Sequence, residues 1–279
     1  MEKANYPIAL MCRVLGVSRS GWYASCRRTR PSDRELRDAE LVEKIREVHE
    51  ASRRTYGSPR VHAQLVRDGL DVGKDRVARL MRAAGIKGRV RRRFKVTTNS
   101  KHDRPIAPNT LNREFRAESS DSVWCADITY IATAAGWVYL AAIIDVATRM
   151  IVGWSMANHM RTELVERALL NALTARAPAS RLVHHSDRGS QFASASYRGL
   201  LEQYGIECSM SRAGNCYDNA MIESFFGSAK QEWVHHHRWA NLTEARAAMH
   251  DYIEVFYNRQ RLHSSLGYRT PAEADMDAA

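Results

Sequence analysis

The sequence predicts an α/β fold, a mixed β-sheet with flanking helices, preceded by a small all-helical region. Two observations lead to this fold class. The apolar residues repeat at helical spacing in the first third of the chain and alternate in the manner of strands from residue 122 onward. Between these parts, a stretch rich in Pro, Asn, Ser and Thr lacks periodicity and predicts a linker. We therefore expect a basic helical region at residues 1–95, a linker at 96–121 and a core at 122–235. A C-terminal helix and tail at 236–279 are expected to complete the core.

The composition argues against several classes of protein. The 279 residues are 44% hydrophobic, which is enough for a packed core and disfavours a disordered chain. No apolar run is long enough to cross a membrane, and the first ten residues lack the layout of a secretory signal. The five cysteines are scattered without a C-x-x-C pair, so we expect neither a zinc site nor a disulfide framework. This cysteine usage fits a reducing cytoplasm.

Positive charge is concentrated in the N-terminal part. The whole chain has a formal charge of +11. Residues 1–100 hold 24 Lys and Arg against 11 Asp and Glu, whereas residues 101–279 hold 18 against 20. A basic module joined to a nearly neutral one predicts binding to a polyanion. A merely basic surface is the alternative, and the clustered arginines, which suit bidentate phosphate contacts, argue against it.

The basic region is predicted to consist of short helices. We expect two around a turn in residues 7–25, one at about 34–51, one that closes at Gly69, and one within 71–86. Ser58 is predicted to cap the helix that closes at Gly69, because Pro follows it at the first helical position.

The last two of these helices are typical of a helix-turn-helix, in which the second, arginine-rich helix enters the major groove of DNA. The candidate DNA contacts are arginines on its outward side and in the basic arm that follows at 87–95: Arg76, Arg79, Arg82, Arg91, Arg92 and Arg93. We expect the arm to track phosphates or to enter a minor groove. A solvated helix face is the alternative interpretation of the helical arginines. Within the linker, the segment 108–115 is expected to dock on the next domain.

The core is predicted to hold five strands and several helices. Strands are expected at 122–132, at two places within 136–157 with a turn near 145–149, at 181–187 and at 206–211. Helices are expected at 162–176, at 194–205 and at about 217–233. The first three strands follow one another with short turns, which predicts an antiparallel meander. The strand and helix order predicts a mixed sheet with helices packed on it.

Five acidic residues are candidates for metal binding. Asp127 lies in an otherwise apolar strand, where an unpaired carboxylate is costly. Asp187 follows the end of a short apolar strand, and Glu223 lies on the last predicted core helix. Asp145 precedes a turn and Asp218 can cap a helix, so both have simpler structural interpretations. We select Asp127, Asp187 and Glu223, although any chain of this length offers three acids by chance. Carboxylates without Cys or a close His pair favour Mg²⁺ or Mn²⁺.

Two further features bear on this site. Lys230 follows Glu223 by seven residues, which is about two helical turns, so both side chains leave the helix on the same side. The run His235, His236 and His237 suggests a metal cluster at first sight. Three consecutive side chains cannot all face one ion from a regular element, so a solvated loop is the better interpretation.

Several long motifs carry a resemblance to a known family. They are WCADITYI at 124–131, HSDRGSQF at 185–192, SRAGNCYDNAMIESFF at 211–226 and YNRQRLHSSLGYRTPAE at 257–273. With 35 residues between Asp187 and Glu223, the chain resembles the OrfB-type transposases of bacterial insertion sequences, whose catalytic core is similar to that of retroviral integrases. The likeness runs from about residue 40 to 274. One departure is Ala229, where many relatives have Leu.

The resemblance implies a ribonuclease-H-like fold and a role for each matching position. It implies that Asp127, Asp187 and Glu223 bind metal, two Mg²⁺ (or Mn²⁺) ions, and that Lys230 contacts DNA near the cleaved phosphate. The resemblance also implies that three residues support the site: His185, Gln191 and Asn219. A purely structural role is equally open for these three. The residues that it places in a C-terminal signature, packing or contacting DNA, are Tyr257, Asn258, Arg259, Arg261 and His263.

The function implied is that of a DNA transposase or integrase catalytic subunit. Such an enzyme cleaves phosphodiester bonds at element ends and transfers the freed 3′-hydroxyl to another strand. The expected partners are double-stranded DNA (element ends and target), an upstream-frame protein or fusion, and further copies of the chain on DNA, in the bacterial cytoplasm at the nucleoid. The alternatives are a non-catalytic DNA-binding regulator of transposition and a simple ribonuclease-H-like nuclease.

Overall fold

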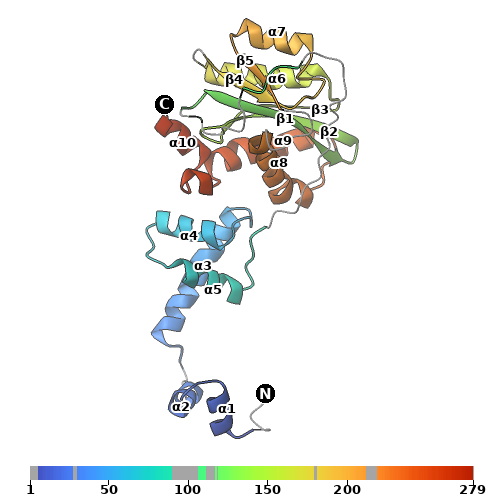
Figure 1. The fold of residues 1–279 in the computed structure, drawn as a ribbon. Helices are drawn as coiled ribbons and strands as arrows, with labels where there is room; N and C mark the ends of the chain where they lie inside the picture. Colours follow the sequence, from blue (N-terminus) through green and yellow to red (C-terminus); the bar gives the residue numbers. More distant parts are fainter. Residues whose placement is uncertain are drawn as a thin grey trace.

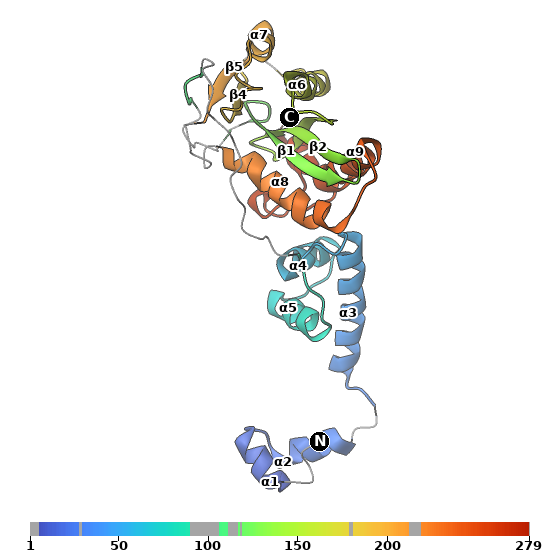
Figure 2. The same cartoon turned by 90° about the vertical axis from the view of Figure 1, so that its right-hand side faces the viewer.

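The computed structural model describes residues 6–27, 30–89, 106–110, 117, 119–178, 181–211 and 219–278. The basic region folds into short helices as expected. These are α1 (Ile8–Val14), α2 (Arg19–Arg27), α3 (Asp33–Ala51), α4 (Ser58–Arg67) and α5 (Lys74–Ala83). Helices α3, α4 and α5 pack together beneath the core, whereas α1 and α2 lie apart from them in both views (Figures 1 and 2). The described N-terminal part therefore contains two separate helical units.

The helix starts show how local chemistry sets the boundaries. Helix α3 begins after Ser32, whose hydroxyl accepts from the Glu35 backbone N–H while the Glu35 carboxylate accepts from the Ser32 N–H, a reciprocal capping box. Helix α4 begins one residue earlier than predicted. Gly57, not Ser58, is its N-cap, because Gly57 has the extended backbone that a cap requires and Ser58 is already helical. Pro59 remains in the first turn, where its missing N–H costs nothing.

A five-stranded mixed sheet forms the core, with strand order β3-β2-β1-β4-β5. The strands are β1 (Val123–Thr133), β2 (Gly136–Asp145), β3 (Ile151–Ala157), β4 (Val183–Ser186) and β5 (Glu207–Met210). The first three form the predicted antiparallel meander, and β4 and β5 run parallel to β1. Strand β4 pairs with β1 only as far as Ala126, and among the described strands none pairs with the second half of β1 on that side.

Helices cover both faces of the sheet (Figure 1). One face carries α6 (Thr162–Arg176) and α7 (Ala195–Gln203); the other carries α8 (Ala220–Glu232), α9 (Leu242–His250) and the π-helical segment η4 (Asp251–Tyr257). Strand β1 alternates as predicted: Trp124 and Ala126 pack toward α6, and Cys125 and Ile131 pack toward α8.

The remaining elements lie at the C-terminal side of α8 and at the end of the chain. They are the 3₁₀ turns η3 (Val234–His236) and η5 (Ser264–Leu266) and the helix α10 (Pro271–Ala278). Before the sheet, the described part of the linker contacts β5. The Thr110 backbone N–H donates to Ser209 Oγ at 3.1 Å, and the Met210 N–H donates to the Pro108 carbonyl at 3.3 Å. This confirms, for residues 108–110, that the segment docks on the core. Among the described helices, none has the length and apolar character that crossing a bilayer requires.

Candidate active site

Asp127 lies within β1, and Asp187 directly follows the end of the neighbouring parallel strand β4. Ala126 on β1 pairs with Ser186 on β4, and each aspartate is the next residue after this pair. The chain thus delivers two carboxylates to neighbouring positions, at the point where β4 ends beside β1. The Asp127 Oδ1 accepts from the Ile128 N–H at 2.7 Å, which fixes the carboxylate against its own strand.

The Asp187 carboxylate is held by a tight turn. Its Oδ1 accepts from the Gly189 N–H at 2.9 Å. A Cβ atom at position 189 would lie 2.9 Å from the same oxygen and 3.3 Å from Gln191 Oε1, so only glycine leaves room for the carboxylate in this position.

Helix α8 brings Glu223 and Lys230 to the two aspartates. The evidence is electrostatic: burial raises the pKa of Asp127 well above its ordinary value, and the neighbouring charges of Asp187 and Glu223 raise it further. The Ile128 N–H and the Lys230 ammonium oppose this rise in pKa. Asp187, Glu223 and Lys230 therefore lie near enough for their charges to act on Asp127.

Lys230 is nearly buried beside this group, at 8% exposure. Its Nζ lies 4.5 Å from the centre of the Tyr130 ring on β1, a cation–π contact. Burial lowers the pKa of Lys230, and the charge of Asp127 opposes that shift. Sequence reasoning did not single out Tyr130. The only local signal was its position three residues after Asp127.

The donor set fits a hard divalent cation. It consists of carboxylate oxygens, the ligands that Mg²⁺ and Mn²⁺ prefer. Besides burial, the negative charges of Asp187 and Glu223 raise the pKa of Asp127. A bound divalent cation would offset this negative charge. Within the described parts of the chain, no three His, Cys, Asp or Glu side chains are grouped closely enough to form a complete metal site. The acids are thus near enough to affect the pKa of Asp127, but their side chains do not form a complete set of metal ligands.

The three predicted supporting residues take structural roles near the site. Asn219, the N-cap of α8, does not cap its helix with its side chain; its Nδ2 donates to the Ala126 carbonyl at 3.0 Å, and among the described residues its Oδ1 has no hydrogen-bond partner. The sequence allowed Asp218 or Asn219 as the cap, and Asp218 lies outside the described residues. His185 is fully buried between Ser209 Oγ and Ser211 Oγ, at 2.9 and 3.1 Å.

Gln191 ties the turn after β4 to the segment before α6, because its Nε2 donates to the Met160 carbonyl at 2.8 Å. Its side chain therefore supports the backbone around Asp187.

The alternative acid Asp145 has a structural role, and the histidine run lies on the surface. Asp145 is fully buried and accepts from the Asp121 N–H at 2.7 Å and from the Thr148 N–H at 2.8 Å, so it closes the turn after β2. This confirms the structural interpretation of Asp145. The residues His235–His237 are exposed around the 3₁₀ turn η3, in agreement with a solvated segment.

Two of the three helical arginines predicted to contact DNA form ion pairs within the helical unit. Arg76 and Arg79 on α5 both bind the carboxylate of Asp38 on α3, at 2.7 and 2.8 Å, with side-chain exposures of 38% and 49%. Part of their charge therefore joins two helices of the same unit, whereas Arg82 is exposed. The predicted contacts Arg91, Arg92 and Arg93 lie outside the described residues.

Comparisons with known proteins identify the family. The model of an HTH-like domain matches residues 35–94, and two models of an integrase core domain match residues 117–216 and 204–271. The chain is 48% identical over 262 residues to an insertion element IS600 uncharacterized 31 kDa protein of Shigella sonnei, covering 94% of this chain and 96% of that one. It is 38% identical over 273 residues to transposase InsF for insertion sequence IS3A of Escherichia coli, covering 98% and 95%.

The chain belongs to the insertion-sequence transposase family with an integrase core domain. As a transposase of this family, it has the ribonuclease-H-like core and the helix-turn-helix-like unit that the sequence predicted. Solved structures with a similar fold include a simian T-cell lymphotropic virus intasome, at 13% identity and a TM-score of 0.49 over 83% of this chain and 74% of that one. Another is the HTLV-2 integrase catalytic core domain with magnesium, at 16% identity and a TM-score of 0.46 over 57% and 99%.

Proposed function

We propose that this transposase cleaves phosphodiester bonds at the ends of its element and joins the freed 3′-hydroxyl to another DNA strand. In this proposal Asp127, Asp187 and Glu223 are the ligands of Mg²⁺ or Mn²⁺, two ions in all. What supports it is that Asp127 and Asp187 each follow a pair of hydrogen-bonded neighbours on adjacent strands, Ala126 and Ser186, and that the charges of Asp187, Glu223 and Lys230 act on Asp127, whose pKa is raised by burial. Family membership supports the reaction class, a polynucleotidyl transfer.

The protein residues divide the work as follows. When bound, such ions supply an activated oxygen nucleophile and stabilise the leaving oxygen. The chain holds the carboxylates rigidly: Asp127 through its own strand, Asp187 through the Gly189 turn, and Glu223 through a helix whose start is bonded to β1 by Asn219. Lys230 adds a positive charge beside Asp127, in the place where a phosphate of the bound strand would need one.

We assign DNA binding to the basic helical region. The exposed Arg82 and the partly exposed Arg76 and Arg79 lie on α5, the helix that corresponds to a recognition helix, and the arm with Arg91, Arg92 and Arg93 extends the same charge. Double-stranded element ends and target DNA are the proposed substrates. Joining two ends calls for further copies of the chain on DNA, and an upstream-frame protein or fusion is the proposed partner for end recognition.

A cleavage and joining assay with a matched pair of variants tests this function. Wild type, Glu223→Gln and Glu202→Gln are incubated with labelled element-end DNA and Mg²⁺, with and without the upstream-frame protein. Glu202 is an exposed residue of α7 and controls for the loss of one negative charge. We expect nicking and strand joining by wild type and Glu202→Gln, and loss of both by Glu223→Gln with DNA binding retained.

Three other results would contradict the proposal. If Glu223→Gln cleaves as well as wild type, the assignment of the acids is wrong. If wild type cleaves DNA and never joins strands, the chain is a simple nuclease. If wild type binds the ends and never cleaves them, with or without the upstream-frame protein, it is a regulator.

A further inference from the structure

Glu232 is a buried carboxylate at the opposite end and on the opposite side of the helix that carries Glu223. It is the last residue of α8 and is 5% exposed. Nine residues separate it from Glu223, which at about 100° per residue turns the two side chains to opposite faces of the helix. A buried charge needs partners, and those of Glu232 come from two distant parts of the chain.

The core supplies the strongest partners. Arg261 donates to both carboxylate oxygens of Glu232, at 2.8 and 2.6 Å, and the Tyr252 hydroxyl donates to Oε2 at 2.9 Å. Burial acts to raise the pKa of Glu232, but the charge and hydrogen bonds of Arg261, aided by Arg60 and Tyr252, outweigh it and keep the pKa below its ordinary value. The carboxylate is therefore ionised, and its hydrogen bonds come from the C-terminal segment.

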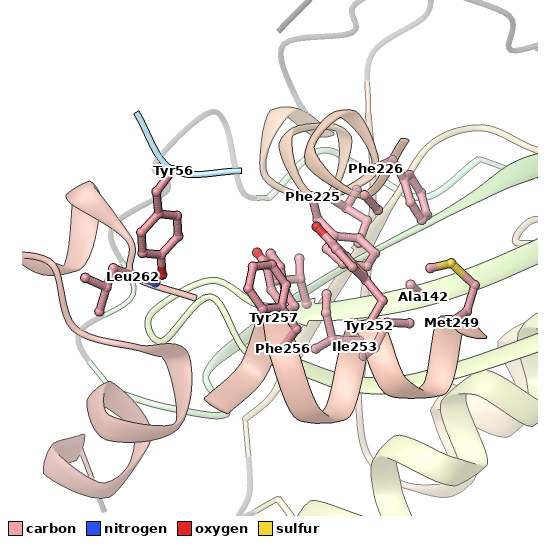
Figure 3. Close-up of a cluster of buried hydrophobic side chains, with 14 of the residues drawn as sticks. Tyr56, Ala142, Phe225, Phe226, Met249, Tyr252, Ile253, Phe256, Tyr257 and Leu262 are labelled. Atoms are coloured by element: carbon pink, nitrogen blue, oxygen red, sulfur yellow. Dashed lines mark hydrogen bonds between the residues drawn. The ribbon is translucent and has the colours of Figure 1, made fainter. Parts of the chain in front are cut away.

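The helix-turn-helix-like unit supplies the remaining partners. Arg60 on α4 places its guanidinium 3.8 Å from Glu232 Oε1, and the Arg89 guanidinium donates to the Glu232 carbonyl. Tyr56, just before α4, donates its hydroxyl to the Gln260 carbonyl at 3.2 Å and accepts from the Leu262 N–H at 2.7 Å. Figure 3 shows Tyr56 beside Leu262, at the end of the apolar cluster that runs on through Tyr257 to Phe225 of α8.

A second bridge joins the same two parts of the chain without touching α8. Arg67 on α4 binds the carboxylate of Glu273 on α10 through two contacts, at 2.5 and 3.0 Å, and donates to the Tyr268 carbonyl at 3.1 Å. Arg53, which follows α3, adds an ion pair with Asp251 at 2.8 Å and a cation–π contact with Trp233, the C-cap of α8. Among these described attachments, the one at Arg67 does not reach the helix that carries Glu223, whereas the one at Glu232 does.

We propose that Glu232 is a positioning residue that couples the DNA-binding unit to catalysis. Its contacts with Arg60, Arg89 and, through Arg261 and the 260–262 segment, with Tyr56 hold the end of α8. The position of the helix-turn-helix-like unit is thereby transmitted to the far end of the helix, where Glu223 lies. This rests on the proposed function of Glu223. It assigns a role to the C-terminal signature: Arg261 and Leu262 complete the connection, and they do so inside the protein.

The test uses the full-length chain with the double variant Tyr56→Phe/Arg60→Met and the control Arg67→Met. The control removes the Arg67–Glu273 bridge, which joins the same two parts of the chain but does not contact α8. Three quantities are measured for each protein: affinity for element-end DNA, thermal midpoint, and single-turnover cleavage rate on saturating DNA. We expect the double variant to keep the affinity and the thermal midpoint of the control and to cleave about tenfold or more slowly, because a small shift of a catalytic group is costly in rate.

The separation of rate from affinity distinguishes coupling from a merely structural role. Equal cleavage rates for the double variant and Arg67→Met overturn the proposal. So does a parallel loss of affinity, stability and rate. Should the double variant not fold, Tyr56→Phe alone, which removes one oxygen atom, takes its place under the same criteria. If wild type itself does not cleave, the proposed function has failed, which the wild-type arm reveals separately.

Discussion

Replacing Asn258 with Leu tests how the C-terminal segment is attached to the sheet. Asn258 is 1% exposed, and its side chain makes two hydrogen bonds with one residue of the edge strand β3. The Ile151 N–H donates to Asn258 Oδ1 at 2.9 Å, and Asn258 Nδ2 donates to the Ile151 carbonyl at 3.0 Å. The amide thus occupies the place that the backbone of a further strand would take. Leu has a similar volume and can make neither bond.

The cost follows from the two backbone groups left without partners. Each buried, unpaired group costs about 1–3 kcal/mol, so the substitution should lower the free energy of unfolding by about 2–6 kcal/mol. Against a total of about 5–15 kcal/mol for an ordinary domain, this is a large loss. It should appear as a lower denaturant midpoint with an unchanged slope.

The neighbouring Arg259, which is exposed, provides the control. Arg259→Leu should change the free energy of unfolding by no more than about 0.5 kcal/mol. The sequence left open whether the C-terminal signature packs or contacts DNA, and the burial of Asn258 assigns this residue to packing. A stability loss below about 1 kcal/mol for Asn258→Leu, together with weaker DNA binding, would refute that assignment.

Two further predictions concern stability. A Cβ at Gly153 on β3 would lie 2.5 Å from the Ala168 carbonyl oxygen and 2.6 Å from Ala172 Cβ, so Gly153→Ala should force β3 and α6 apart and lower the free energy of unfolding by about 1–3 kcal/mol in chemical denaturation. Gly199→Ala in α7 meets nothing within 4 Å and should be neutral or stabilising; similar effects for both variants would contradict the packing. Burial and the charge of Arg261 lower the pKa of His263 to about 2, so below about pH 6.5 the unfolded chain binds a proton that the folded chain does not. The free energy of unfolding should therefore decrease as the pH is lowered, by up to about 1.4 kcal/mol per pH unit from this residue. For His263→Gln, the free energy of unfolding should depend less steeply on pH between pH 6 and 4. An unchanged pH dependence would contradict the lowered pKa of His263.

The elements could be predicted from the sequence, and the three acids could be singled out as candidates, because both leave local signals. Strand β1 alternates between two apolar environments, and Asp127 interrupts that pattern with a charge. Asp187 ends an apolar run, and Glu223 shares a helix face with Lys230. These patterns span a few residues each, and a single chain displays them without any knowledge of its partners.

Contacts between distant segments could not be predicted in this way. The hydrogen bond between Tyr56 and Leu262 spans 206 residues, and Arg261 is 29 residues from Glu232. The sequence pattern around Tyr56 or Glu232 does not indicate which distant residue each one contacts. The arginines of α5 were expected to face solvent or DNA, but Asp38 of α3 binds two of them because α3 and α5 pack side by side. Such pairs depend on the tertiary arrangement, which local spacing does not encode.

Helix α8 is held at both ends by side chains that are not part of the proposed metal site. At its start, Asn219 is bonded to β1 one residue before Asp127. At its end, Glu232 is bonded to the C-terminal segment and to the DNA-binding unit. A helix of 13 residues is about 20 Å long and stiff, so a shift at either end moves Glu223 relative to the two aspartates. Substitutions at Asn219 or Glu232 should therefore alter catalysis without touching a catalytic group. The two ends differ in what controls them: the start follows the sheet that carries Asp127, and the end follows the unit that binds DNA.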